Sequence, residues 1–143
     1  MNTAKEKLIE GDSNDLIHSL AALPEQERFN AIRDMINDPK YGMRMLKVAN
    51  ASLREARYFE EILRIGIATA DAYNIKFWLE CTVPRLGFKN TVHLLKLSIA
   101  ENRAGVRKAL YYLPQTAPNL SASDLRLLNE LRDALQDESS STD

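Results

Sequence analysis

Apolar residues recur every three or four positions along most of this chain, the spacing that places them on one face of an α-helix. The clearest case is residues 88–113, where one apolar run reaches Ile99, a short polar break follows at residues 100–103, and a second run begins near Ala104. No stretch alternates apolar and polar residues with a period of two, so we expect no β-sheet. The pattern predicts an all-α fold of about eight helices, and the short loops between them predict antiparallel helix pairs.

Proline and small polar residues predict where the helices of the first half begin and end. Asp12 or Ser13 can cap the first helix, and Pro24 ends it and begins the second. Ser52, with Glu55 three residues later, predicts a capping box before the fourth helix. These signals predict helices over residues 13–23, 24–36, 39–49 and 53–73. The apolar stripes of these helices are Leu16, Ile17, Leu20 and Leu23; Phe29, Ile32, Met35 and Ile36; Tyr41, Met45 and Val48; and Ala56, Phe59, Leu63, Ile67 and Ala70.

The second half repeats this organisation. A fifth helix over residues 75–83 is apolar on most sides, so we expect it to be central. Pro84 either kinks that helix or stops it. Two prolines predict a linker over residues 114–119, after which Ser121 or Ser123 caps a last helix. The apolar stripe of that helix is Leu125, Leu128, Leu131 and Leu135.

Length and composition indicate one domain. The chain has 143 residues, enough to bury a core without disulfides or metals. We expect a frayed segment over residues 1–11, a single helical domain over residues 12–136 and a disordered acidic tail over residues 137–143. The single cysteine, Cys81, stands in an apolar run and is expected to be a core residue. There is neither an apolar leader nor a stretch long enough to span a bilayer, so we expect a soluble, cytoplasmic protein.

Charge is distributed unevenly along the chain. Residues 85–118 carry six basic groups and one acidic group, whereas residues 1–38 and 119–143 each carry a net charge of −4. This basic segment is either a solvated face that the acidic ends neutralise or a patch, in one or two parts, for an acidic partner. Its cationic residues are Arg85, Lys89, Lys96, Arg103, Arg107 and Lys108.

Aromatic and titratable residues add few candidates. Tyr111 and Tyr112 point to adjacent helix faces, so one of them is expected at the surface, whereas Phe77 and Trp78 either line a groove or belong to the core. The two histidines have no second ligand at metal-binding spacing. No nucleophile, phosphate-binding or paired-cysteine motif is present, so we expect no cofactor, no metal and no enzymatic activity.

Two segments resemble units of the HEAT family of helical repeats. In one, residues 92–99 form the first helix, residues 100–103 the turn, and residues 105–110 (GVRKAL) the start of the second helix. In the other, residues 42–49 form the first helix and residues 53–56 (LREA) occupy the place of VRKA. The resemblance implies an α-solenoid that binds other macromolecules along a concave face. A compact irregular helical bundle is the alternative architecture.

The leading functional hypothesis is a non-enzymatic protein–protein interaction module, an adaptor or regulator that binds an acidic partner surface through a helical-repeat groove. A nucleic-acid-binding module is a second hypothesis, although the isoelectric point near 6.1 disfavours it. A third is a structural protein that self-associates through Leu125, Leu128, Leu131 and Leu135. The predicted partner-binding residues are Arg85, Lys89, Arg103, Arg107, Lys108, Tyr111 and Tyr112.

Overall fold

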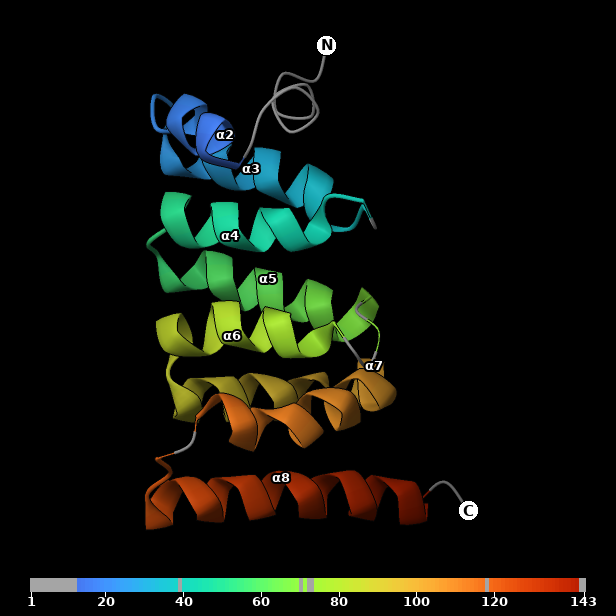
Figure 1. Ribbon diagram of the computed structural model, residues 1–143. Helices are drawn as coiled ribbons and strands as arrows, with labels where there is room; N and C mark the ends of the chain where they lie inside the picture. Colours follow the sequence, from blue (N-terminus) through green and yellow to red (C-terminus); the bar gives the residue numbers. More distant parts are fainter. Residues whose placement is uncertain (1–12, 39, 70, 72–73, 118, 142–143) are drawn as a thin grey trace. The chain divides into compact units, whose positions relative to one another are not determined.

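The computed structural model of the protein describes residues 13–38, 40–69, 71, 74–117 and 119–141, and every regular element in them is an α-helix (Figure 1). This confirms the all-α prediction. The predicted frayed segment over residues 1–11 lies outside the described residues. The helices are α2 (Ser13–Leu20), α3 (Glu25–Ile36), α4 (Gly42–Ser52), α5 (Ala56–Thr69), α6 (Ile75–Leu86), α7 (Phe88–Thr116) and α8 (Ala122–Ser141).

The chain divides into two compact units, Met1–Tyr58 and Phe59–Asp143, where the sequence predicts a single domain over residues 12–136. Each unit buries its own apolar residues: α4 contacts α2 and α3 in the first, and α7 contacts α6 and α8 in the second. In the second unit, α8 continues to Ser141 and so extends into the segment over residues 137–143 that was predicted to be a tail. A helix that is already anchored by buried leucines extends at little cost, since each added residue brings one hydrogen bond.

The first unit confirms most of the predicted apolar stripes. Leu23 is an exception, because α2 ends at Leu20 and the Leu23 side chain is 39% exposed. A residue that precedes proline avoids the helical conformation, and Pro24 itself is extended, with ψ of 153°. Pro24 is therefore the N-cap of α3 and not part of a continuous helical run. The buried apolar residues of this unit are Leu16, Leu20, Phe29, Ile32, Met35, Ile36, Tyr41, Met45, Leu46, Val48, Ala49, Leu53 and Tyr58.

The junction between α4 and α5 differs from its prediction. Ser52 is the last residue of α4, and its Oγ is buried without a hydrogen-bond partner among the described residues. Leu53 is extended, with φ of −118° and ψ of 150°, and α5 begins at Ala56. The predicted capping box of Ser52 and Glu55 is therefore wrong, because the serine side chain is buried in the core and does not cap α5.

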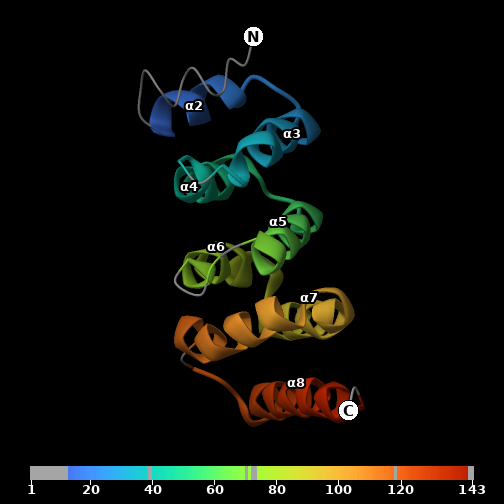
Figure 2. The ribbon, with the colours of Figure 1, turned by 90° about the vertical axis from the view of Figure 1, so that its right-hand side faces the viewer.

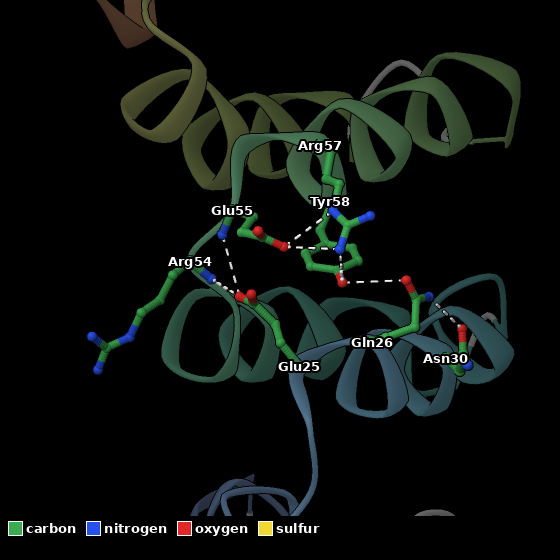
Figure 3. A network of polar contacts seen from close by, with 7 residues as sticks. All are labelled: Glu25, Gln26, Asn30, Arg54, Glu55, Arg57 and Tyr58. Carbon is green, nitrogen blue, oxygen red and sulfur yellow. Dashed lines mark hydrogen bonds and ion pairs between the residues drawn. The ribbon is translucent and has the colours of Figure 1, made fainter.

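A carboxylate from α3 caps the start of α5 instead (Figure 3). Glu25 accepts hydrogen bonds from the backbone N–H groups of Arg54 and Glu55, the second at 3.2 Å. Partial burial raises the pKa of Glu25, but these backbone hydrogen bonds outweigh it, and the pKa is lowered overall. Tyr58, in the first turn of α5, completes the junction: its ring centroid lies 4.8 Å from that of Phe29, and its hydroxyl donates to a glutamine of α3 at 3.3 Å.

In the second unit, α7 is a pair of helices separated by a break. Asn102 has non-helical φ and ψ angles of −142° and 59°, and the two halves fold back beside each other (Figures 1 and 2). This confirms the break predicted over residues 100–103. Just beyond it, Gly105 lies so close to the carbonyl oxygen of Ile67 in α5 that a Cβ would collide with it. Gly66 makes a similar approach to the ring of Trp78 in α6, where a Cβ would lie 2.6 Å from Cε3.

Two prolines lie inside helices of this unit. α6 continues through Pro84 to Leu86, so Pro84 does not stop it. α7 continues past Pro114 to Thr116, which corrects the predicted linker over residues 114–119. Each proline is in the last turn of its helix, where it removes one backbone hydrogen bond and leaves little helix to disrupt.

Local caps mark two further boundaries in this unit. Gly87 separates α6 from α7 with φ of 84°, a backbone conformation that favours glycine, and its N–H donates to the carbonyl of Val83 at 2.8 Å. Ser121, one of the two serines predicted to cap the last helix, caps α8. Its Oγ accepts from the N–H of Asp124 at 3.1 Å, and the Asp124 carboxylate accepts from the N–H of Ser121 at 3.2 Å.

Candidate functional site

The residues predicted to bind a partner lie on α6 and α7 of the second unit. Arg85 is near the end of α6, Lys89 is in the first turn of α7, and the other five follow the break at Asn102. Since the two halves of α7 fold back on each other, Lys89 and the later residues belong to different helices of the pair (Figure 2). The candidate residues therefore form separate groups on the surface of the unit.

Two of the predicted arginines make contacts within the unit. The guanidinium of Arg85 lies over the ring of Phe59, 5.1 Å from its centroid. Arg103 is partly buried, and its Nη1 donates to the backbone carbonyl of Leu135 in α8 at 2.7 Å. This bond ties the start of the second half of α7 to the later part of α8, so Arg103 contributes to the packing of the unit.

Four of the remaining five residues form a surface group on the second half of α7, which we call the Tyr111 patch: Arg107, Lys108, Tyr111 and Tyr112. Tyr111 is 70% exposed and lies one helical turn after Arg107, which is also exposed. Tyr112 is half-buried and meets Tyr111 edge to face, with ring centroids 4.9 Å apart. The patch presents an aromatic pair held in a defined orientation beside two cationic side chains.

Lys89 belongs to a different feature, a groove of about 350 Å³ between the first half of α7 and α8. His93 and Lys96 line it together with Lys89, which puts the three side chains on one face of the helix. The regular spacing of residues 89, 93 and 96 would have allowed this group to be found from the sequence. The residues that line this α7–α8 groove are Lys89, Asn90, Val92, His93, Lys96, Leu127 and Glu130.

A second groove, of about 430 Å³, lies between α5 and the first half of α7. Glu61 and Glu101 make it more acidic than the α7–α8 groove, and Glu61 forms an ion pair with Arg64 at 3.7 Å. Sequence reasoning missed this groove because the contact between α5 and α7 depends on the close approach at Gly105, which no local pattern indicates. The residues that line it are Glu61, Arg64, Ile65, Ala68, Leu97, Ser98, Glu101 and Asn102.

The predicted route to self-association is not open in this structure. Leu128, Leu131 and Leu135 are at most 4% exposed, because their side chains form part of the core of the second unit. Leu125 is 48% exposed and is the member of the stripe that remains at the surface. A second copy of the chain therefore cannot pair along the whole leucine stripe without unfolding part of the core.

Residues with catalytic or ligand-binding chemistry are few in the described part of the chain. It contains no group of three or more His, Cys, Asp or Glu side chains placed to hold a metal ion. Cys81 is buried, and burial raises the pKa of its thiol to about 12, so the group is neutral. Trp78 is also buried, which assigns it to the core and not to a groove.

Comparison of the chain with protein-family models, with curated proteins and with solved structures found no match. Among the described helices, none has the length and apolar content that crossing a lipid bilayer requires.

Proposed function

We propose that this protein is a non-enzymatic interaction module that binds an acidic surface of a partner protein through the Tyr111 patch. The observation that carries the proposal is the 70% exposure of Tyr111 beside Arg107 and Lys108. Tyrosine and arginine are the residue types that, with tryptophan, most often dominate the binding energy of protein interfaces. A tyrosine immobilises few torsions on binding, and contact with Tyr112 restricts this one further.

Charge supports an acidic partner. Residues 85–118 hold six basic groups against one acidic group. Such an excess steers an acidic surface towards the patch and raises the association rate at low salt. We also propose a cytoplasmic location, which the presence of a single, buried cysteine, Cys81, supports.

A helical-repeat architecture is part of the proposal, and the spacing of the helices supports it. Helices α3, α5, α7 and α8 begin at residues 25, 56, 88 and 122, so that successive starts are 31, 32 and 34 residues apart. A recurring unit of two antiparallel helices is typical of α-solenoid proteins. HEAT and armadillo units are longer, about 40–47 residues. The proposed likeness to HEAT proteins therefore concerns the helix-pair design and not the repeat length.

The test is affinity capture from lysate of the source cell, followed by quantitative mass spectrometry. The bait is the wild-type chain or the Arg107→Glu/Tyr111→Ala variant, and the matched control is Arg126→Glu, an exposed charge reversal on α8. Arg103 is left intact because its bond to Leu135 supports the fold. Every sample is compared with and without nuclease, and helicity is checked by circular dichroism.

The proposal expects at least one protein that wild type and Arg126→Glu capture with or without nuclease and that the patch variant loses. The isolated complex should then weaken as salt rises, since charged side chains contribute to it. Capture that disappears on nuclease treatment would instead indicate nucleic-acid binding. Equal capture by the patch variant and wild type would show that the Tyr111 patch is not the binding site.

A further inference from the structure

The first half of α7 carries an exposed ridge of four residues spaced four apart: Lys89, His93, Leu97 and Glu101. Rows of residues at this spacing form one of the surface ridges through which α-helices pack against each other. All four side chains are exposed, and Leu97 is 62% exposed, a high value for a leucine. The α7–α8 groove flanks the first two residues of the ridge, and the α5–α7 groove flanks the last two. The ridge therefore stands between two depressions.

The charge along this ridge changes from positive to negative. It begins with a cation at Lys89, passes through His93 and the apolar Leu97, and ends with the carboxylate of Glu101. Within the described residues, neither Lys89 nor Glu101 takes part in an ion pair. Both charges therefore remain solvated and can pair with an opposite charge on another molecule. A complementary ridge on a partner must present the same types of side chain in the reverse order. It then places a carboxylate beside Lys89, an apolar side chain beside His93 and a cation beside Glu101.

The chain itself contains such a ridge. When two helices pack through rows of residues four apart, the rows run side by side and the axes cross at about −50°, the commonest angle in globular proteins. Two-fold symmetry allows the two rows to run parallel or antiparallel, and only the antiparallel arrangement places unlike charges beside each other. In sequence, the pair Lys89 and Glu101 and the pair His93 and Leu97 are both centred on position 95, so the two pairs share one centre along the ridge. One antiparallel register therefore places each Lys89 beside Glu101 of the second copy and each His93 beside Leu97 of the second copy.

We propose that two copies of this chain associate through the ridge Lys89–His93–Leu97–Glu101, packed antiparallel with the two-fold axis between His93 and Leu97. The contact would remove the Leu97 side chain of each copy, which is 62% exposed in the single chain, from water. It would also form two symmetric ion pairs at its ends. The interface lies on the first half of α7, apart in sequence from the Tyr111 patch, so the two proposals can succeed or fail separately.

Sedimentation-velocity ultracentrifugation of the purified full chain over a wide concentration range tests this interface. Wild type should show a reversible monomer–dimer equilibrium that weakens at high salt. Lys89→Glu sets two glutamates against each other at both ends of the contact, and Glu101→Lys sets two lysines against each other. Each variant alone should weaken dimerisation on the order of tenfold or more. Lys47→Glu, an exposed charge reversal in the first unit, is the matched control and should dimerise as wild type does.

Recombining the two changes gives the decisive result. A mixture of the Lys89→Glu and Glu101→Lys chains should form a heterodimer, because both ends then pair a glutamate with a lysine. The double variant Lys89→Glu/Glu101→Lys should regain the homodimer for the same reason. A wild-type chain that stays monomeric at every concentration overturns the proposal. So does a mixture or double variant that stays as weak as the single variants, because the charges would then not face each other.

Discussion

Two helix junctions of this protein are stabilised in different ways. The break inside α7 is bounded by local sequence: a polar stretch interrupts two apolar runs, Asn102 leaves the helical conformation, and glycine follows three residues later. The junction between α4 and α5 depends on a carboxylate 29 residues away, since the Glu25 carboxylate accepts a hydrogen bond from the backbone N–H of Arg54. The comparison shows that the place where a helix stops can be a local property, whereas the group that satisfies its open end can come from a distant part of the chain.

The largest expected effect is at the α7 break. In Gly105→Ala, the new Cβ would collide with the carbonyl oxygen of Ile67, so α5 and α7 must separate. We expect the free energy of unfolding to fall by about 3 kcal/mol, as overpacking in a core does. Urea denaturation measures the change. Helix propensity alone favours alanine over glycine by about 1 kcal/mol, so the sign of the effect identifies the steric contact.

Ala104→Ser is the control for this variant, because residue 104 is exposed and precedes Gly105 directly. Its unfolding free energy should stay within about 0.5 kcal/mol of wild type. An increase in stability on Gly105→Ala would show that α7 does not approach Ile67 so closely and would remove the physical basis of the α5–α7 groove.

The second prediction concerns the hydrogen bond between Arg103, which follows the α7 break, and Leu135 in α8. In Arg103→Met the aliphatic stem is largely kept, but the guanidinium that donates to the Leu135 carbonyl is lost. A partly buried hydrogen bond from a charged donor contributes about 1.5–3 kcal/mol, and we expect a loss near the lower limit. Hydrogen exchange should show faster exchange in α8, while protection of the first unit stays unchanged. Arg126→Met, which changes an exposed arginine of α8, is the control, and equal effects of both variants would contradict the role given to Arg103.

The sequence predicted the fold class and the break in α7 because both depend on neighbours in the chain. Local signals also predicted the cap at Ser121, where Asp124 lies three residues away. They misplaced the α4–α5 junction, because Ser52 satisfies the local capping pattern while the packing of α4 buries it. The candidate site could be predicted only in part, for the same reason. The basic residues of α7 can be read from the sequence, whereas the contact between Arg103 and Leu135 links residues 32 apart and cannot.

The third prediction tests the long-range cap. The Glu25 carboxylate binds two backbone N–H groups, and loss of a cap costs about 1 kcal/mol, so Glu25→Ala should lower the unfolding free energy by that amount near neutral pH. The pKa of Glu25 is lowered in the folded protein. Its contribution is therefore fully present above the ordinary pKa of a glutamate and is lost as the pH falls through the lowered value.

Urea denaturation of wild type and Glu25→Ala at neutral and acidic pH measures this dependence. The difference in stability between the two proteins should shrink in acid. Glu27→Ala removes another acidic group from the first turn of α3 and serves as the control. A Glu25→Ala variant as stable as wild type at neutral pH would show that solvent caps α5 as well as the carboxylate does.

The smallest expected effect is that of Ser52→Ala. The sign of the change in unfolding free energy distinguishes the two interpretations of the α4–α5 junction. If Ser52 capped α5, as its local sequence indicates, Ser52→Ala would destabilise the protein by about 1 kcal/mol. In the structure its Oγ is buried and makes no hydrogen bond with the described residues, so alanine removes an unsatisfied polar group and keeps the buried Cβ. Alanine also has the higher helix propensity, and Ser52 is a residue of α4.

We therefore expect Ser52→Ala to raise the unfolding free energy by about 0.5–1 kcal/mol. Ser19→Ala, which changes an exposed serine of α2, should change it little. Destabilisation on Ser52→Ala would mean that the hydroxyl does bind a backbone group and that Glu25 shares the capping of α5 with it.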